Sequence, residues 1–214
     1  CAVHHPDTYT VFAGGDDFFL IGPWLQTQKL AAEMREQFRR YVAENAAITF
    51  SAGIAVIKPG LPPGKLSAYA EEALEAAKAY PANENEKRKQ LGSKNSVCVY
   101  GQVVSWQQWS GIQEAFERIG RLKEAYGLST GFVYSMLQFC EQAEAEKGGD
   151  INAGMWRSRF AYRTRRFVND SKSITDKNNG YAQLTEAFYQ NGIEKLGAKY
   201  RIPLFNHFYL LRAK

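Results

Sequence analysis

Two glycines followed directly by two aspartates are the residues of this sequence whose types and spacing best suit chemistry. They are Gly14, Gly15, Asp16 and Asp17. Short apolar runs with β propensity flank them at 9–13 and 18–21, which predicts a hairpin. Adjacent carboxylates repel each other unless a cation lies between them, and Mg²⁺ or Mn²⁺ also leaves positions open for triphosphate oxygens. The pattern indicates metal-dependent nucleotidyl transfer, with a merely polar turn as the alternative.

The elements that must position this turn follow it in the first half of the chain. Apolar residues at helical spacing predict a helix at about 25–45, and 48–57 has the composition of a buried strand. A second helix is expected at 66–80, an irregular polar loop at 81–94 and a strand at 96–104. These elements together predict a sheet with helices packed on one face.

The second half of the chain is expected to be helical. Helical periodicity recurs at 107–126, 129–147, 151–169 and 181–199. The fold class is therefore α+β: residues 1–104 form one domain with a sheet, and residues 105–214 form an all-α domain.

One of the expected helices carries a cluster of arginines. The candidates for binding a nucleic-acid backbone are Arg157, Arg159, Arg163 and Arg166. The last three stand at i, i+4 and i+7 and so share a helix face, and the planar guanidinium suits phosphate. The alternative is a solvated basic face over an aromatic core stripe. His207 is expected to be a packed histidine rather than a ligand.

Composition sets broad limits on the function. The formal charge of +5 and the pI near 9.0 are compatible with a nucleic-acid or nucleotide partner. Three widely spaced cysteines form neither a disulfide framework nor a zinc motif, which suits a reducing cytoplasmic location. No apolar run is long enough to cross a membrane.

The order of these elements resembles the second half of the palm domain that GGDEF nucleotide cyclases share with many polymerases. That domain has a ferredoxin-like sheet and carries acidic residues in the same hairpin. The stretches ITFSAGIA at 48–55 and EEALEAAK at 71–78 look like the strand and the lysine-bearing helix that follow the turn in GGDEF proteins.

A closer resemblance is to the large signature subunit of type III CRISPR complexes, particularly the Csm subtype. A GGDD turn, the Ser-Lys-Asn segment at 93–95 and the phrase WRSRFAYRTRR at 156–166 carry it. The resemblance implies synthesis of cyclic oligoadenylate from ATP with Mg²⁺, in antiviral defence. The implied partners are guide RNA, target RNA and the other effector subunits, namely the backbone, small and guide-tag-capping subunits.

The same resemblance implies roles for single residues. Asp16 and Asp17 would bind the metal and orient the 3′-hydroxyl, while Gly14 and Gly15 would let the nucleotide approach the backbone. Ser51 would line the site, and Lys78 and Lys94 would neutralise triphosphate charge. The alternatives are a core hydroxyl for Ser51, a solvent-facing helix lysine for Lys78 and a loop lysine for Lys94.

The resemblance also implies parts that the sequence does not contain. A complete palm of this family begins with a strand and two helices, whereas eight residues precede the expected hairpin. We therefore expect the N-terminal part of the palm, a nuclease domain of the HD type, a zinc site and a first palm to lie elsewhere, and His4 and His5 do not replace them. Two other functions stay open: a non-catalytic scaffold, and an enzyme that uses GTP as diguanylate cyclases do.

Overall fold

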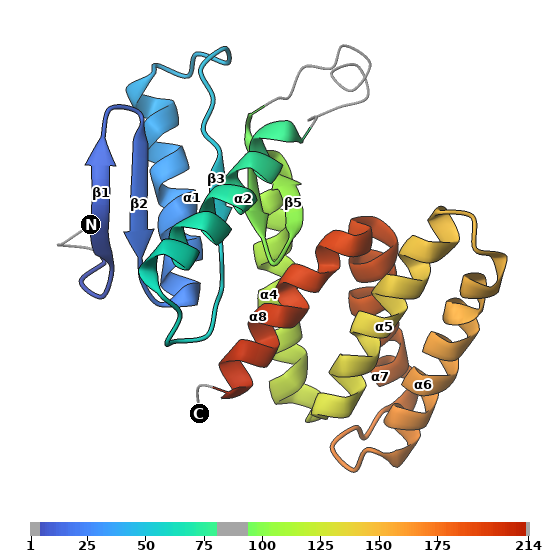
Figure 1. The fold of residues 1–214 in the computed structure, drawn as a ribbon. Helices are drawn as coiled ribbons and strands as arrows, with labels where there is room; N and C mark the ends of the chain where they lie inside the picture. Colours follow the sequence, from blue (N-terminus) through green and yellow to red (C-terminus); the bar gives the residue numbers. More distant parts are fainter. Residues whose placement is uncertain (1–4, 81–93, 213–214) are drawn as a thin grey trace. The chain divides into compact units, whose positions relative to one another are not determined.

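The computed structural model describes residues 5–80 and 94–212, and the chain forms two compact units. Unit 1 comprises Cys1–Gln108 and unit 2 comprises Trp109–Lys214. Unit 1 contains all the strands of the described residues, and unit 2 is helical, as the α+β prediction required (Figure 1). His4, Ser93 and almost all of the expected polar loop lie outside the described residues.

The first element of unit 1 is an antiparallel hairpin. β1 (Tyr9–Gly14) pairs with β2 (Asp17–Ile21), and the register joins Gly14 to Asp17 across the turn. A shift of register between Thr10 and Phe12 marks a bulge in β1. Among the described strands this hairpin forms a sheet of its own, whereas the sequence predicted one sheet.

The other sheet of unit 1 has three strands, in the order β3-β4-β5. β3 (Ala52–Ile54) runs parallel to β4 (Ser96–Val99), which is antiparallel to β5 (Gln102–Ser105). The strand expected at 48–57 is thus only three residues long, and the one expected at 96–104 is two strands. Tyr100 and Gly101 both adopt positive φ, 53° and 71°, and so reverse the chain in a two-residue turn between them.

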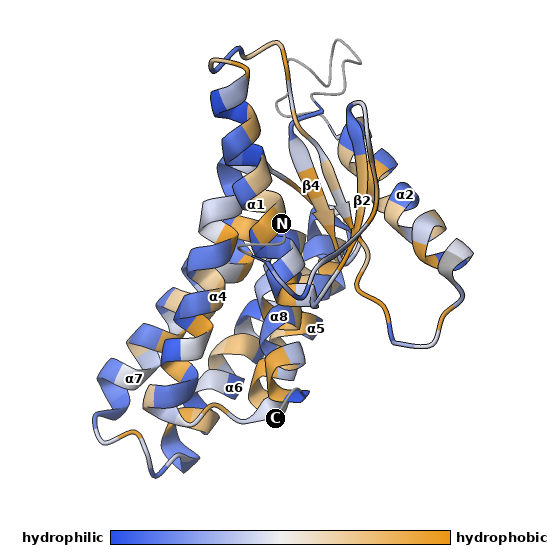
Figure 2. Cartoon of the chain, turned by 90° about the vertical axis from the view of Figure 1, so that its left-hand side faces the viewer, coloured by the Kyte–Doolittle hydropathy of each residue, from blue (hydrophilic) through white to orange (hydrophobic). Residues whose placement is uncertain are grey.

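Two long helices cover the strands of unit 1. α1 (Trp24–Tyr41) and α2 (Pro63–Ala79) lie on opposite sides of the strands, as the two views agree (Figures 1 and 2). The expectation that helices pack on one face only was wrong. All four residues of β4 are buried, and a strand that is buried on both faces needs cover from both sides.

Gly53 explains how closely α2 approaches the sheet. A Cβ atom at Gly53 would lie 2.2 Å from the backbone nitrogen of Leu74 and 2.6 Å from the carbonyl oxygen of Ala70. Only glycine leaves room for the backbone of α2 at this distance. The crossover helix is therefore held directly against β3.

Unit 2 is built from helices with short connections. They are α4 (Trp106–Tyr126, which begins in unit 1), α5 (Thr130–Lys147), η1 (Ile151–Met155), α6 (Trp156–Asp170), α7 (Lys177–Leu184), η2 (Thr185–Glu194), η3 (Gly197–Tyr200) and α8 (Arg201–Arg212). Side chains cap three of them: Ser129 accepts from the backbone N–H of Phe132, Asp150 from Asn152 and Asp176 from Asn179.

The core of unit 2 is rich in aromatic residues. Phe132, Trp156, Phe160, Phe188 and Tyr200 are all buried in one hydrophobic cluster. Figure 2 shows polar and apolar residues alternating along the helices, which is how an amphipathic helix turns one face to such a core. In the part of the chain that the structure describes, no helix combines the length and the apolar composition that crossing a membrane requires.

Candidate functional site

The GGDD turn has the geometry of a tight hairpin loop. Gly15 and Asp16 form the turn, and Gly15 has φ +63°, which suits glycine at the first central position of a two-residue loop. Asp17 begins β2 opposite Gly14. The side chains of Asp16 and Asp17 are exposed, and no atom lies within 4 Å of the place where a Cβ of Gly15 would stand. The tip of the hairpin is therefore open to a ligand.

The two carboxylates fit a divalent cation as a partial ligand set. Within residues 5–80 and 94–212, neither Asp16 nor Asp17 forms an ion pair or a hydrogen bond through its side chain, so both keep their oxygen atoms for a ligand. No group of three or more His, Cys, Asp or Glu residues within these ranges could hold a metal ion. Mg²⁺ commonly uses one or two carboxylates together with water and substrate phosphates.

An aromatic cluster connects β2 with the segment before β3. Phe18, which follows Asp17, stacks on Phe50 with ring centroids 5.9 Å apart. Phe38 of α1 and Trp106 contact the same ring at 5.8 and 6.0 Å. The indole N–H of Trp106 also donates to the carbonyl oxygen of Phe50 at 2.8 Å. These contacts hold the turn end of the hairpin beside the chain that leads into Ser51.

Ser51 and Lys94 are brought together by a hydrogen bond. The Ser51 hydroxyl donates to the carbonyl oxygen of Lys94, whose backbone adopts φ 45°. Because Ser51 precedes β3 and Lys94 precedes the parallel strand β4, the two residues stand at the same end of the sheet. The bond fixes the backbone of Lys94, while its side chain is exposed.

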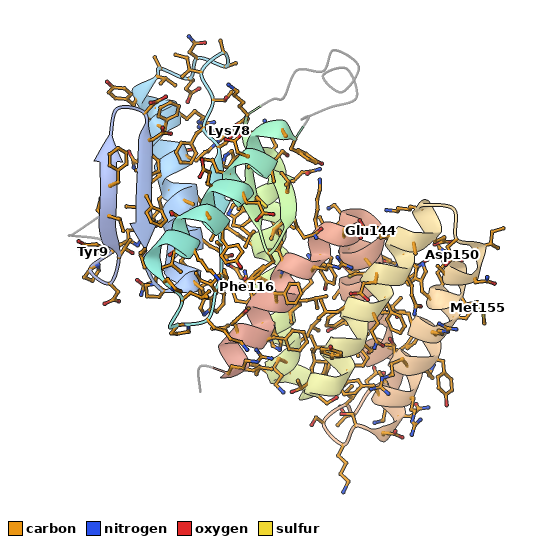
Figure 3. All side chains as sticks on the ribbon, in the orientation of Figure 1. Tyr9, Lys78, Phe116, Glu144, Asp150 and Met155 are labelled. Carbon is orange, nitrogen blue, oxygen red and sulfur yellow. The ribbon has the colours of Figure 1, made fainter. Side chains whose placement is uncertain are left out.

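Lys78 lies near the same end of β4. The Ser96 hydroxyl donates to the carbonyl oxygen of Ala77 at 2.5 Å, which joins the last turn of α2 to the first residue of β4. The ammonium group of Lys78, a residue labelled in Figure 3 whose side chain is 38% exposed, donates to the exposed Glu75 at 3.1 Å. No hydrogen bond or ion pair within the described ranges links Lys78, Lys94 or Ser51 to the two aspartates.

The structure contains a cavity that the sequence did not reveal. Its wall includes Phe50 and Asn95, the residue that follows Lys94. The cavity has a volume of about 220 Å³, and its lining includes Phe38, Arg39, Phe50 and Asn95. Arg39 pairs with Glu36 at 3.2 Å and with Glu44 at 3.5 Å, so its charge is already balanced. The cavity alone does not resemble an anion site. The sequence could not predict this cavity, because charged residues on one side of a helix have the same pattern whether that side lines a cavity or faces solvent.

The arginines of α6 fall into two groups. Arg157 forms an ion pair with Glu146 at 2.5 Å, and the indole N–H of Trp156 donates to the same carboxylate at 2.9 Å. These two donors lower the pKa of Glu146, and the bond to Glu146 raises the pKa of Arg157. The side chains of Arg159, Arg163 and Arg166 are exposed. Arg157 is therefore engaged in a short ion pair within unit 2, whereas Arg163 and Arg166 make only longer contacts, to the carbonyl oxygen of Gly131 at 3.4 Å and to Asp170 at 3.6 Å.

His207 is buried in unit 2, as expected for a packed histidine. Burial lowers its pKa, and the charge of Lys123 adds to this effect. Its Nε2 atom has no hydrogen-bond partner among the described atoms.

Comparison with known proteins gives a family match for unit 1. Residues 2–98 match the model of the Cas10/Cmr2 second palm domain. This span contains the hairpin, α1, β3, the crossover helix α2 and all of β4 except its last residue, Val99. It includes every candidate residue named above for nucleotide and metal binding.

Three relatives carry the name CRISPR system single-strand-specific deoxyribonuclease Cas10/Csm1 (subtype III-A). The chain is 37% identical to that of Methanocaldococcus jannaschii over 98 residues, which is 46% of this chain and 12% of the relative. It is 36% identical to that of Thermococcus onnurineus over 144 residues, 64% of this chain and 18% of the relative. It is 30% identical to that of Enterococcus italicus over 134 residues, which is 60% of this chain and 16% of the relative. The chain thus spans less than a fifth of the length of these relatives.

Proposed function

We propose that this chain, whose residues 2–98 match the Cas10/Cmr2 second palm domain, is part of the large subunit of a type III CRISPR effector complex and that its GGDD hairpin carries a nucleotidyltransferase site. The substrate is ATP and the product is cyclic oligoadenylate. The observation that supports this proposal most is the pair Asp16 and Asp17, exposed and free of cationic partners at a tight, open turn within the palm match.

Each residue has a distinct role in the proposed reaction. Asp16 and Asp17 would hold Mg²⁺ or Mn²⁺, which in such sites lowers the pKa of an attacking hydroxyl and neutralises the leaving pyrophosphate. Gly14 and Gly15 leave the backbone of the turn accessible to the nucleotide. The two glycines thus favour close approach of the substrate.

Two lysines are the proposed partners of the triphosphate. Lys78 is already paired with Glu75, but an exposed ion pair contributes only about 0–1 kcal/mol. A triphosphate, with its several negative charges, can therefore compete for the ammonium group. The side chain of Lys94 extends from a backbone that Ser51 anchors, so fewer conformations have to be given up on binding. Ser51 is thus proposed as a positioning residue.

The proposal is tested on the effector complex assembled with guide RNA and bound to target RNA. The double variant Asp16→Asn/Asp17→Asn keeps the size of both side chains but removes the charge that binds metal. We expect at least a hundredfold loss of oligoadenylate formed from ATP and Mg²⁺, since electrostatic and metal contributions are commonly of that size. Chromatography of the products gives the measurement.

A matched control removes two carboxylates elsewhere. Glu117 and Glu124 are exposed on α4, and the variant Glu117→Gln/Glu124→Gln should retain full activity. Equal product from the aspartate variant and the wild type would favour a scaffold without catalysis. Product formed from GTP in preference to ATP would instead favour a chemistry like that of diguanylate cyclases. Either result would overturn the proposal.

A further inference from the structure

α6 concentrates the positive charge of the chain. Its fifteen residues hold five arginines against one aspartate, a formal charge of +4, whereas the whole chain of 214 residues has +5. The face that packs into unit 2 is uncharged: Trp156, Phe160, Thr164 and Val168 are buried at a spacing of four residues. The charge therefore lies on the remaining surface of the helix.

Two of the five arginines are occupied by contacts within unit 2. Arg157 pairs with Glu146, and its guanidinium group also lies 4.9 Å from the centre of the Trp156 ring. The guanidinium group of Arg165 lies 4.0 Å from the centre of the Tyr181 ring, a cation–π contact. Both side chains stabilise the packing of α6, so a ligand would have to displace these contacts in order to bind them.

The other three arginines lack strong partners. Within the described ranges Arg159 has neither an ion pair nor a hydrogen bond. Arg163 donates to the carbonyl oxygen of Gly131 at 3.4 Å, and Arg166 forms an exposed ion pair with Asp170 at 3.6 Å. Contacts of this length on the surface are weak. All three guanidinium groups are therefore free to take a stronger anionic partner.

An aromatic side chain lies within the same series. Tyr162 stands three residues after Arg159 and is 68% exposed, unlike Trp156 and Phe160, which α6 buries. With a rise of about 1.5 Å per residue, Arg159 and Arg166 are about 10 Å apart along the helix, with Tyr162 and Arg163 between them. The surface thus combines three guanidinium groups that can bind phosphate with one aromatic ring on which a base can stack.

We propose that this surface, which consists of Arg159, Tyr162, Arg163 and Arg166, binds single-stranded RNA. The three arginines contact successive phosphates and Tyr162 stacks on one base, so recognition is independent of sequence. Charge complementarity selects the ligand, because the surface combines high positive charge with one exposed ring. The proposal does not depend on the nucleotidyltransferase site, since every residue that carries it lies in unit 2.

Exposed apolar residues next to this surface raise the alternative of a protein partner. Ile151 and Met155, at the two ends of η1, are 91% and 56% exposed, and Figure 3 shows the side chain of Met155 at the outer side of this segment. A protein could use them as anchors. They precede the arginines in the chain, so the two possibilities predict different residues at the interface and can be separated.

The test measures binding of a fluorescent polyuridine strand to the full chain over a series of salt concentrations. For single strands, log K falls with log salt by about 0.7 for each phosphate contact. The variant Arg159→Ala/Arg163→Ala/Arg166→Ala should therefore reduce the magnitude of the slope by about 2 and weaken binding at low salt. The matched control Arg121→Ala/Lys172→Ala/Lys195→Ala removes the same charge from other exposed positions and should change the slope by less than about 1. Equal effects of the two triple variants would overturn the proposal.

Tyr162 supplies an independent measurement. Tyr162→Ala should weaken binding about 5-fold or more while leaving the salt slope unchanged, whereas Tyr162→Phe should bind as the wild type does, because stacking needs only the ring. Photocrosslinks from 4-thiouridine RNA should fall on the peptide that contains Tyr162. Three results would contradict the proposal: crosslinks confined to other peptides, binding of single-stranded DNA without RNA, or loss of a partner subunit in the Tyr162 variant with RNA binding intact.

Discussion

At the scale of single residues, burial controls the protonation of His207. The imidazole is enclosed in unit 2 on α8, and the nearby charge of Lys123 also disfavours a second positive charge. The pKa of His207 in the folded protein is therefore below its ordinary value of 6.5. When the pH falls below 6.5, the unfolded chain takes up a proton that the folded chain resists, so protonation favours unfolding.

We predict that unit 2 loses stability from this residue as the pH falls from 6.5 towards 5. A single group contributes at most about 1.4 kcal/mol per pH unit. His207→Gln removes the titration, so the free energy of unfolding should depend less steeply on pH in the variant than in the wild type. Urea unfolding at pH 7.5 and at pH 5.5, monitored by hydrogen exchange of the α8 amides, measures the free energy of unfolding of the wild type and of the variant. The same pH dependence in the two proteins would show that His207 does not titrate in this way.

Single contacts also decide what the sequence could predict about the site. Asp16 and Asp17 are identifiable from type and spacing, because the two glycines before them and the apolar runs on both sides mark the turn in the sequence itself. The ion pair of Lys78 with Glu75 and the bond from Ser51 to the Lys94 carbonyl were not predictable. The first requires the rotamers of two side chains on α2. The second requires two residues that are 43 positions apart in the chain to meet at one end of a sheet.

At the scale of elements, patterns of apolar residues identified most helices but not the details of their geometry. η2 is a π-helix of ten residues, where the sequence predicted ordinary helical structure. An i→i+5 helix has no periodicity that distinguishes it over so short a span. Packing accounts for it: Ala187, Phe188 and Ile193 are buried, and a Cβ at Gly192 would lie 2.7 Å from the Tyr200 ring.

The contact between β3 and α2 leads to a prediction at this scale. Gly53→Ala should destabilise unit 1 by about 1–3 kcal/mol or more, because the new methyl group meets the backbone of α2 rather than a movable side chain. Hydrogen exchange of the amides in β3 and β4, measured over a urea series, gives the change in the free energy of unfolding.

Gly111 provides a control substitution, for which we expect the free energy of unfolding to rise rather than fall. It lies within α4, and a Cβ there would meet nothing within 4 Å. Gly111→Ala should therefore stabilise the helix by about 0.5–1 kcal/mol, since alanine has the higher helix propensity. A Gly53→Ala protein as stable as the wild type would mean that α2 does not press on β3.

At the scale of the whole molecule, the chain combines an α+β unit that matches the second palm domain with a helical unit, and the sequence predicted this fold class correctly. Short apolar runs with β propensity and the turn residues between them predicted the hairpin, and helical periodicity predicted the helices. The cover of β4 from both sides was not foreseen, because a short apolar run has the same sequence pattern whether one or two layers pack on it.

The central claim is that Asp16 and Asp17 bind a divalent cation together with the triphosphate of ATP. Anomalous diffraction from crystals of the target-bound complex, grown with Mn²⁺ and a non-reactive ATP analogue, tests it most directly. We predict a manganese peak within about 2.0–2.3 Å of a carboxylate oxygen of Asp16 or Asp17, with phosphate oxygens on the same ion. A nucleotide bound in the palm with its manganese on other residues, and both aspartates turned towards solvent, would contradict it.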